Sequence, residues 1–468
     1  MKYNGVWVVK NNQRFQIDMC SGPLFGKIIR FSIPLMLSNI MQLLFHAADL
    51  IVLGRYAPGE AMAAVGATAG LTVLVLNIFF GLATGINVLA ARYIGARDNR
   101  NLAKTVHTAM AIALYWGAGM VILGLIISKP MLRLMATPDA ILNKAALYMW
   151  IYCLGIPFVV FYNFGSAILR ALGDTHRPLI YMIIAGVVNV VLNLFFVLVF
   201  KWDVAGVAVA TKISNVVSAW LILRALMKNN DASKLIWKNI RIHWDILKDM
   251  LKIGLPAGIQ GSFFAISNIL IQSAVNSLGW QAIAGNTAAS SLEGIVYVGS
   301  SAFYFTAISF TGQNYGGKKY QRIIRSIYYC LICTSTFALC SGVSIVIAGR
   351  QLLAFYNPDP QIIEWGMIRL KVLLTSYYLC GIMDVFSGSL RGLGHSFKPM
   401  LVTLLGVCVF RIFWVMAIFP LSRSMTNLMF SYPVSWTLVS LVNGSILYVV
   451  CRKLSRRWHV HNQNTLMS

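Results

Sequence analysis

Twelve long apolar runs dominate this sequence, and each is long enough to cross a lipid bilayer as a helix, which takes about 20 residues. In the first half they occupy residues 29–54, 61–90, 104–127, 145–168, 178–200 and 204–228. In the second half they occupy residues 250–278, 282–310, 322–348, 365–390, 399–420 and 427–451. A lipid-exposed chain must satisfy its backbone hydrogen bonds internally, so the runs predict an all-α integral membrane protein.

The composition excludes a set of soluble domains. Hydrophobic residues make up 58% of the 468 positions and charged residues only 11%. Soluble domains carry about 25% charged residues to cover their surface. The first 20 residues are polar and do not form a signal peptide. The N-terminus is therefore expected to remain in the cytoplasm.

The distribution of Lys and Arg supports this orientation. With a cytoplasmic N-terminus, 28 of the 39 basic residues fall in inside segments, 7 in outside segments and 4 within spans. Cytoplasmic loops of membrane proteins carry such an excess. We expect a multi-pass protein of the plasma or inner membrane with both termini in the cytoplasm. Because topology explains the positive charge, we expect no nucleic-acid binding.

The two halves of the sequence resemble each other. The decapeptide LRALGDTHRP at 169–178 aligns with LRGLGHSFKP at 390–399, with five of ten positions identical. The same register brings Gly95 onto Gly316. Six spans per repeat is an even number, so the two repeats run parallel through the membrane. We expect a cytoplasmic segment at 1–28, an N-lobe at 29–228, a linker at 229–249, a C-lobe at 250–451 and a cytoplasmic tail at 452–468.

Two similar bundles that face each other can open a cleft alternately to either side of the membrane, as secondary transporters do. The sequence contains no GxxxxGK[ST] nucleotide motif and no HExxH or GxSxG motif. We therefore predict a transporter rather than an enzyme, with no cofactor and no metal site.

Three acidic residues lie inside the predicted spans: Asp49, Glu293 and Asp384. Acids within a membrane are costly and mark ion or substrate pathways, although some only lock helices together as ion pairs. Lys212 and Arg411 lie at comparable depths. Lys212 could neutralise Asp49, and Arg411 could neutralise Glu293 or Asp384, or each cation could face an aqueous cleft alone.

Amide and imidazole groups add to the polar positions of the first half. Asn189 and Asn193 lie one turn apart on one helical face. Their carbonyls could coordinate a cation or bind a protonated carboxyl group, or the amides could simply hold helices together. His46 shares a face with Asp49 and could relay protons near neutral pH, or could be a packing residue.

From about residue 20 to residue 450 the chain resembles the MATE family of multidrug and toxic compound extrusion transporters. The resemblance rests on GPLFGKIIRFSIPLMLSNIMQLLFHAADLIVLGR at 22–55, AMAAVGA at 61–67, the two LRxLG loops and SLEGIVYVGSSAFYFTAISFTGQNYGGKKY at 291–320. It implies a V of two six-helix lobes that exports small organic cations in exchange for H⁺ or Na⁺.

The resemblance also implies site residues. An N-lobe cation site falls on Asp49, Asn189, Asn193 and the region of Thr211, and a C-lobe acid falls on Asp384. The chain departs from the family pattern at Asn193, where several members have Asp, at His46, where Asn is common, and at Lys212. With one carboxylate in place of two, H⁺ is favoured as the coupling ion, and Na⁺ coupling is the alternative.

The two repeated loops supply further candidate residues, namely Arg170, Gly173, Pro178, Arg391, Gly394 and Pro399. The expected partners are organic cations and membrane lipid, and the chain is expected to act as a monomer. Two other transporter classes share parts of the pattern. A lipid-linked-sugar flippase of the same superfamily generally has more than twelve spans. The major facilitator signature is imitated only loosely, by ARYIGARDNR at 91–100.

Overall fold

The computed structural model describes residues 2–3, 6–7, 15–56, 59–135 and 137–466. Side chains are described there except at 2–3, 6–7, His46, Leu50, 53–56, 59–64, Ala69, Leu71, Leu74, 203–204 and 457–466. Two short strands, β1 (Lys2–Tyr3) and β2 (Val6–Trp7), pair antiparallel with Lys2 opposite Trp7. The rest of the regular structure in the described residues is helical.

Both halves of the chain are built from helices. The first half forms α1 (Leu24–Tyr56), α2 (Gly59–Gly95), α3 (Asn99–Leu134), α4 (Asp139–Ala171), α5 (His176–Leu194), the π-helical turn η1 (Phe195–Val199) and α6 (Asp203–Lys228). After η2 (Trp237–Asn239), the second half forms α7 (Trp244–Asn276), α8 (Trp280–Gly316), α9 (Tyr320–Ile347), α10 (Gly349–Ala354) and α11 (Pro360–Gly392). A composite helix follows, made of α12 (Phe397–Thr403), η3 (Leu404–Val409), α13 (Phe410–Phe413), η4 (Trp414–Ile418) and η5 (Phe419–Leu421), and then α14 (Met425–Leu466).

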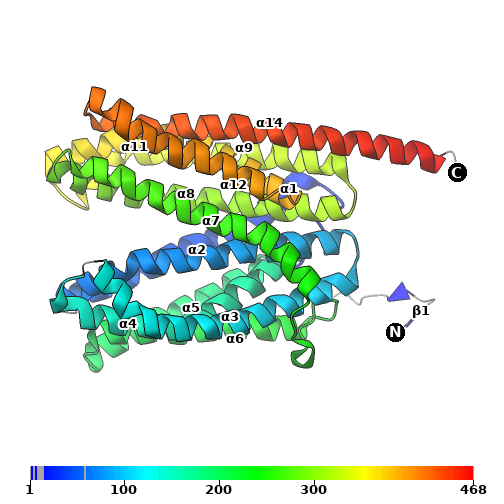
Figure 1. The fold of residues 1–468 in the computed structure, drawn as a ribbon, viewed down its shortest axis with the longest axis horizontal. Coiled ribbons are helices and arrows are strands. Elements are labelled where there is room, and N and C mark those ends of the chain that lie inside the picture. Colours follow the sequence, from blue (N-terminus) through cyan, green and yellow to red (C-terminus); the bar gives the residue numbers. More distant parts are fainter. Residues whose placement is uncertain (1, 4–5, 8–14, 57–58, 136, 467–468) are drawn as a thin grey trace.

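Twelve helices of the described chain are long and apolar enough to cross a membrane, which confirms the predicted all-α membrane fold. Figure 1 shows α7 lying along α2 where the two halves meet, and both chain ends at the same end of the molecule. We call this end the terminal end and the opposite one the far end. The helix α7 begins at Trp244, so the last six residues of the predicted linker are already helical.

The two halves repeat each other in backbone detail. Gly173 and Gly394, which occupy the same position in the two decapeptides, have φ angles of 84° and 83°. Arg97 and Lys318, which correspond in the same register, have φ angles of 57° and 54°. Non-glycine residues rarely adopt this left-handed conformation. The sequence repeat therefore corresponds to a structural repeat.

Buried apolar clusters fill each lobe, and one of them joins α1 to α8 and α9 across the boundary between the lobes. Polar contacts also join the lobes. The Ser32 and Thr306 hydroxyls lie 2.8 Å apart, and Ser309 donates to Asn87 Oδ1 at 3.1 Å. Among the described residues, every hydrogen bond between the lobes lies between the middle of the helices and the terminal end.

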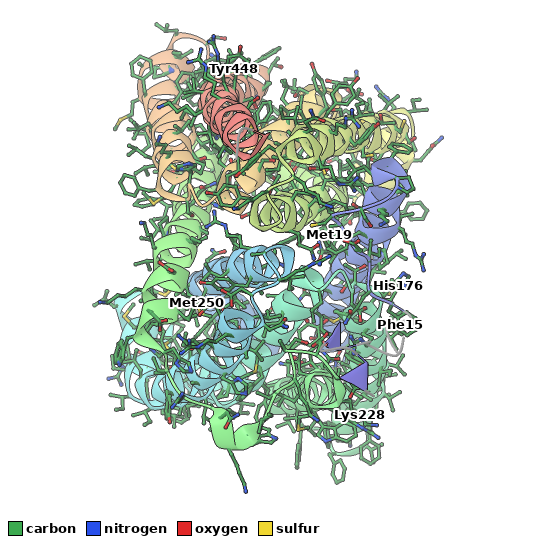
Figure 2. All side chains as sticks on the ribbon, turned by 90° about the vertical axis from the view of Figure 1, so that its right-hand side faces the viewer. Phe15, Met19, His176, Lys228, Met250 and Tyr448 are labelled. Carbon is green, nitrogen blue, oxygen red and sulfur yellow. The ribbon has the colours of Figure 1, made fainter. Side chains whose placement is uncertain are left out.

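The N-terminal segment contributes to this junction. Met19 is fully buried, and Figure 2, viewed from the terminal end, shows it at the seam between the lobes. Its carbonyl accepts hydrogen bonds from Asn314 at 3.2 Å and Arg322 at 3.2 Å. The segment predicted as a cytoplasmic extension thus packs into the fold just before α1.

Candidate functional site

Asp49 is the centre of a polar network that joins three helices of the N-lobe. The Asn193 side-chain amide donates a hydrogen bond to Asp49 Oδ1, and the Thr211 hydroxyl lies 3.3 Å from Asp49 Oδ2. Asn189 Nδ2 donates to Thr211 Oγ1 at 3.2 Å. Asn189 Oδ1 accepts from Asn193 Nδ2 at 3.3 Å. The structure therefore brings together these four residues of α1, α5 and α6, which the sequence singled out separately.

The local geometry of α5 explains why both amides enter this network. Asn189 and Asn193 are spaced by one helical turn and are both buried, at 4% and 0% exposure. The Oδ1 atom of Asn193 has no hydrogen-bond partner in the described part of the chain. A buried carbonyl oxygen without a donor costs free energy. This oxygen is therefore available as an acceptor beside the Asp49 carboxylate.

Lys212 lies near this network but does not form an ion pair in the described structure. Its Nζ lies 3.9 Å from the centre of the Tyr152 ring. The lysine stem fills the space beside Gly155, where a Cβ would have no room. The two alternatives for Lys212 were an ion pair with Asp49 and a cation alone in an aqueous cleft. The described structure shows no such ion pair, and the ammonium group lies on an aromatic face. His46 lies in α1, but its side chain is outside the described residues.

The C-lobe contains a buried ion pair between Glu293 of α8 and Arg369 of α11. Arg369 donates from Nε at 3.0 Å and from Nη2 at 2.6 Å to the same Glu293 Oε2 atom. Its Nη1 donates to Asn286 Oδ1 at 2.7 Å. The two ionic side chains are only 8% and 13% exposed. Glu293 is therefore neutralised by a residue that the sequence placed within a span but did not mark as a partner.

Of the two alternatives for Arg411, the pairing with Glu293 or Asp384 is not formed among the described residues. Arg411 Nε donates to Ser435 Oγ at 3.2 Å, and the guanidinium carbon lies 3.9 Å from the centre of the Tyr432 ring. The physical reason is lateral packing. The helix α11 packs directly along α8, whereas the composite helix that carries Arg411 packs against α7 and α14.

Two polar groups of the C-lobe lack ionic partners in the described structure. Asp384 lies eight residues before the end of α11, which is about 12 Å along the helix axis, and forms no hydrogen bond or ion pair there. Arg411 is 1% exposed, and its Nη1 and Nη2 atoms have no described hydrogen-bond partner. The C-lobe therefore holds a carboxyl and a guanidinium that remain available to other groups.

The repeated loops place two arginines on consecutive aromatic residues of α8. The guanidinium carbon of Arg170 lies 5.0 Å from the Phe305 ring centre, so this residue reaches from the N-lobe to the C-lobe. Arg391 donates to the Tyr304 hydroxyl, and to Gln260 Oε1 at 2.6 Å. These partners were missed from the sequence, although the matching positions of Arg170 and Arg391 in the repeats were a signal that they share a role.

The prolines that end the two repeated decapeptides are both buried. The Pro178 carbonyl accepts a hydrogen bond from the Tyr162 hydroxyl at 3.0 Å. In α5 the chain continues from this proline toward Asn189. This hydrogen bond ties the first turn of α5, the helix that carries the two amides, to α4.

Twelve apolar helices in two repeated lobes, with polar groups buried in each lobe, have the architecture of a membrane transporter. The chain belongs to the MatE family, whose sequence profile matches residues 34–195 and 256–416, one segment in each lobe. This confirms the family resemblance and the transporter class that the sequence predicted.

Similar proteins cover most of the chain. The probable multidrug resistance protein YpnP of Bacillus subtilis (strain 168) is 27% identical over 396 residues, 84% of this chain and 88% of that protein. The FAD transporter of Shewanella oneidensis is 24% identical over 395 residues, 82% of this chain and 86% of that protein. A solved structure of the outward-facing conformation of a multidrug resistance MATE family transporter gives a TM-score of 0.87 at 23% identity. The match covers 94% of this chain and 98% of that one, which confirms the fold.

Proposed function

We propose that this chain is an antiporter of the plasma or inner membrane that exports small organic cations from the cytoplasm in exchange for H⁺. The observation that carries the proposal is the Asp49 network, in which a single carboxylate is held by neutral groups of α5 and α6. The name of the YpnP relative supports a drug-like substrate. Both lobes are present in one chain, so the monomer is the proposed transport unit.

The donors around Asp49 favour a proton over Na⁺ as the coupling ion. An N–H group of Asn193 donates to Asp49 Oδ1, and the Thr211 hydroxyl lies 3.3 Å from Oδ2 while forming a shorter hydrogen bond, 2.8 Å, to the Val207 carbonyl. These neighbours are one hydrogen-bond donor and one hydroxyl, with no second carboxylate among these described contacts of Asp49. A hard cation such as Na⁺ needs several oxygen ligands, as Ca²⁺ and Mg²⁺ do. A protonated Asp49 could instead donate to Asn193 Oδ1 after rotation of the amide, because that oxygen has no described donor. The network thus accommodates both protonation states of one carboxyl group.

The positions of the lobe contacts suggest where the cleft opens. Hydrogen bonds join the lobes from the middle of the helices to the terminal end. The excess of basic residues at the terminal end supports a cytoplasmic location for it. In this orientation the structure is the state closed to the cytoplasm. Asp49 would then take up a proton from outside, and release of that proton inside would complete the exchange.

Efflux from proteoliposomes tests this function. The purified chain would be reconstituted with cationic dyes inside, and either a pH gradient or a Na⁺ gradient would be imposed alone. We expect the pH gradient to drive dye transport and the Na⁺ gradient at equal pH to drive none. Full transport on the Na⁺ gradient alone would assign the chain to the Na⁺-coupled alternative.

Export of anionic organic compounds is a second candidate function. Three arginines are buried in the C-lobe, Arg369, Arg391 and Arg411, and only Arg369 pairs with a carboxylate in the described structure. A relative that is named an FAD transporter supports the same idea. Flavin nucleotides and anionic dyes in the same efflux assay separate the two candidates. A cation exporter should transport only the cationic dyes, and an anion exporter only the flavin nucleotides and anionic dyes.

A further inference from the structure

A cationic cavity lies at the terminal end, on the C-lobe side of the seam. Its volume is about 570 Å³. Four basic side chains line it, namely Arg92, His395, Lys398 and Lys453. The described lining residues include no Asp or Glu. The cavity therefore presents concentrated positive charge to any group that enters it.

Both lobes are needed to form this cavity. Arg92 belongs to α2 of the N-lobe, and its Nε donates to the Gly392 carbonyl of the C-lobe at 3.2 Å. Its guanidinium carbon lies 4.8 Å from the centre of the Tyr315 ring. The guanidinium also occupies the space beside Gly394, where a Cβ would lie within 3.0 Å of it. Because Arg92 crosses the seam, the complete set of cations exists only when the lobes are joined at this end.

The repeat shows which negative group is missing here. In the N-lobe loop, Arg177 forms an ion pair with Asp174 and donates to Asn229 Oδ1 at 3.1 Å. In the register of the two decapeptides, His395 replaces Asp174 and Lys398 replaces Arg177. Neither Lys398 nor Lys453 forms an ion pair with a described residue. The C-lobe loop thus retains the cation of the repeat and lacks its acid.

The N-lobe counterpart of this location is filled by the chain itself. Ile17 N donates to the Gly173 carbonyl at 3.2 Å, and a Cβ on Gly173 would lie within 3.0 Å of the Ile17 backbone. The same segment continues to Met19, which Figure 2 shows at the seam. Beside Gly394 no such segment is present in the described chain, and the cavity lies there instead.

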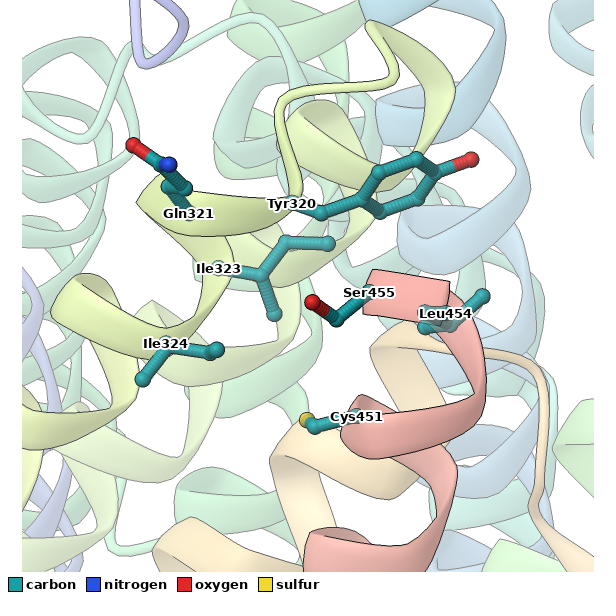
Figure 3. Close-up of a pocket in the computed structure, with 7 residues that line it drawn as sticks. All are labelled: Tyr320, Gln321, Ile323, Ile324, Cys451, Leu454 and Ser455. Carbon is teal, nitrogen blue, oxygen red and sulfur yellow. The ribbon is translucent and has the colours of Figure 1, made fainter. Parts of the chain in front are cut away.

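The wall that α14 contributes to the cavity is largely apolar. Ile446, Val449 and Val450 of α14 line it. On the outer face of the same helix, Tyr448 is 66% exposed and lies at the edge of the molecule in Figure 2. A second cavity, of about 40 Å³, lies between α14 and α9 and is lined by residues such as Ile323 and Cys451 (Figure 3). A ligand with a charged head and an apolar chain therefore fits the larger cavity.

We infer that this cavity binds the phosphate headgroup of an anionic phospholipid from the leaflet at the terminal end, and that the bound lipid stabilises the state in which the lobes are joined there. Arginine and lysine pair strongly with phosphate, and basic clusters beside spans recognise anionic lipids. A free phosphate would match the cations but would leave the apolar α14 wall without a partner. The lipid would bridge the lobes by binding Arg92 from one and Lys398 and Lys453 from the other.

Native mass spectrometry of the purified full chain tests this site. The probes are phosphatidylglycerol, phosphatidylcholine and inorganic phosphate. The test variant is Lys398→Gln with Lys453→Gln, and the control is Arg452→Gln with Arg456→Gln. The control removes the same charge from exposed residues of α14 that do not line the cavity. Thermal unfolding without added lipid checks that both variants fold.

We expect the affinity for phosphatidylglycerol to fall by about tenfold or more in the test variant and to stay unchanged in the control. Phosphatidylcholine, which has no net charge, should bind more weakly than phosphatidylglycerol to the wild type. Equal losses in the two variants would overturn the inference. So would complete competition by inorganic phosphate, because that result would identify a free-phosphate site rather than a lipid site.

Discussion

Gly95 of α2 and Gly316 of α8 each lie against the backbone of the other helix where the lobes meet. A Cβ on Gly95 would lie within 3.0 Å of the Gln313 carbonyl oxygen, and a Cβ on Gly316 within 3.0 Å of the Arg92 carbonyl oxygen. Arg92 and Gln313 correspond to each other in the same repeat register as the two glycines. The contact is therefore symmetric between the repeats, and it lets α2 and α8 approach closely at the terminal end.

Gly316→Ala should separate the lobes at the terminal end. The added methyl group would collide with the backbone of α2, which cannot move aside as a flexible side chain could. Spin-label distances across the terminal end should lengthen, and transport should fall several-fold. Gly119→Ala is the control, because a Cβ there meets nothing within 4 Å. Unchanged distances in Gly316→Ala would show that the glycine contact does not hold the lobes together.

The Glu293–Arg369 pair should be essential to the stability of the C-lobe. Arg369→Met leaves Glu293 buried without its partner, and breaking such a pair typically costs about 3–5 kcal/mol. The double variant Glu293→Gln with Arg369→Met should recover part of this loss. Thermal unfolding in detergent measures both variants. Additive losses would mean that the two residues do not stabilise each other.

Asn193→Asp should make transport respond to Na⁺. The new carboxylate would lie beside Asp49, where the Asn193 amide now donates to Oδ1. Two adjacent carboxylates repel each other unless a proton or a cation lies between them. At alkaline pH, dye efflux by this variant should therefore increase with Na⁺. Asn189→Asp is the comparison, since in the described part of the chain Asn189 contacts Thr211 and Asn193 and forms no hydrogen bond with Asp49 itself. If Na⁺ had no effect on this variant, that result would contradict the inference that Na⁺ is disfavoured because the site has only one carboxylate.

Lipid binding in the cationic cavity should tighten as the pH falls. Burial lowers the pKa of His395, and the positive charges of Lys398 and Arg92 lower it further, so the imidazole is neutral in the lipid-free protein near pH 7. A bound phosphate would raise this pKa, so binding is coupled to the uptake of a proton and strengthens as the pH falls below neutral. Tyr315 and Lys453 are the other titratable groups that line the cavity. A His395→Gln variant should lose most of the pH dependence, and an identical profile in the variant would exclude His395 as its source.

The membrane fold was predictable because spans depend on local properties. Apolar length and the positions of Lys and Arg identified twelve spans and their parallel repeat without any knowledge of packing. The N-lobe network was predictable for a related reason. Asn189 and Asn193 share a helical face, and the family resemblance supplied Asp49 and Thr211. The structure brings all four together.

The pairing of Glu293 with Arg369 could not be predicted from how far each basic residue lies along its helix. Arg369 lies nine residues from the far end of α11, and Arg411 lies ten residues from the far end of its composite helix. Only the side-by-side packing of α11 on α8 selects Arg369 as the partner of Glu293. The insertion of Ile17 and Met19 at the seam was also not predictable, because it depends on backbone hydrogen bonds that carry little sequence signal.

Proton coupling through Asp49 is the central claim, and proton movement in proteoliposomes measures it most directly. An internal pH dye would report H⁺ release when an organic cation gradient is imposed across vesicles that contain either wild-type protein or Asp49→Asn. The replacement is nearly isosteric, and its amide can still contact Asn193 and Thr211, so the fold should persist. We predict substrate-dependent proton movement in the wild type and none in Asp49→Asn. Equal proton movement in the two proteins would contradict the claim.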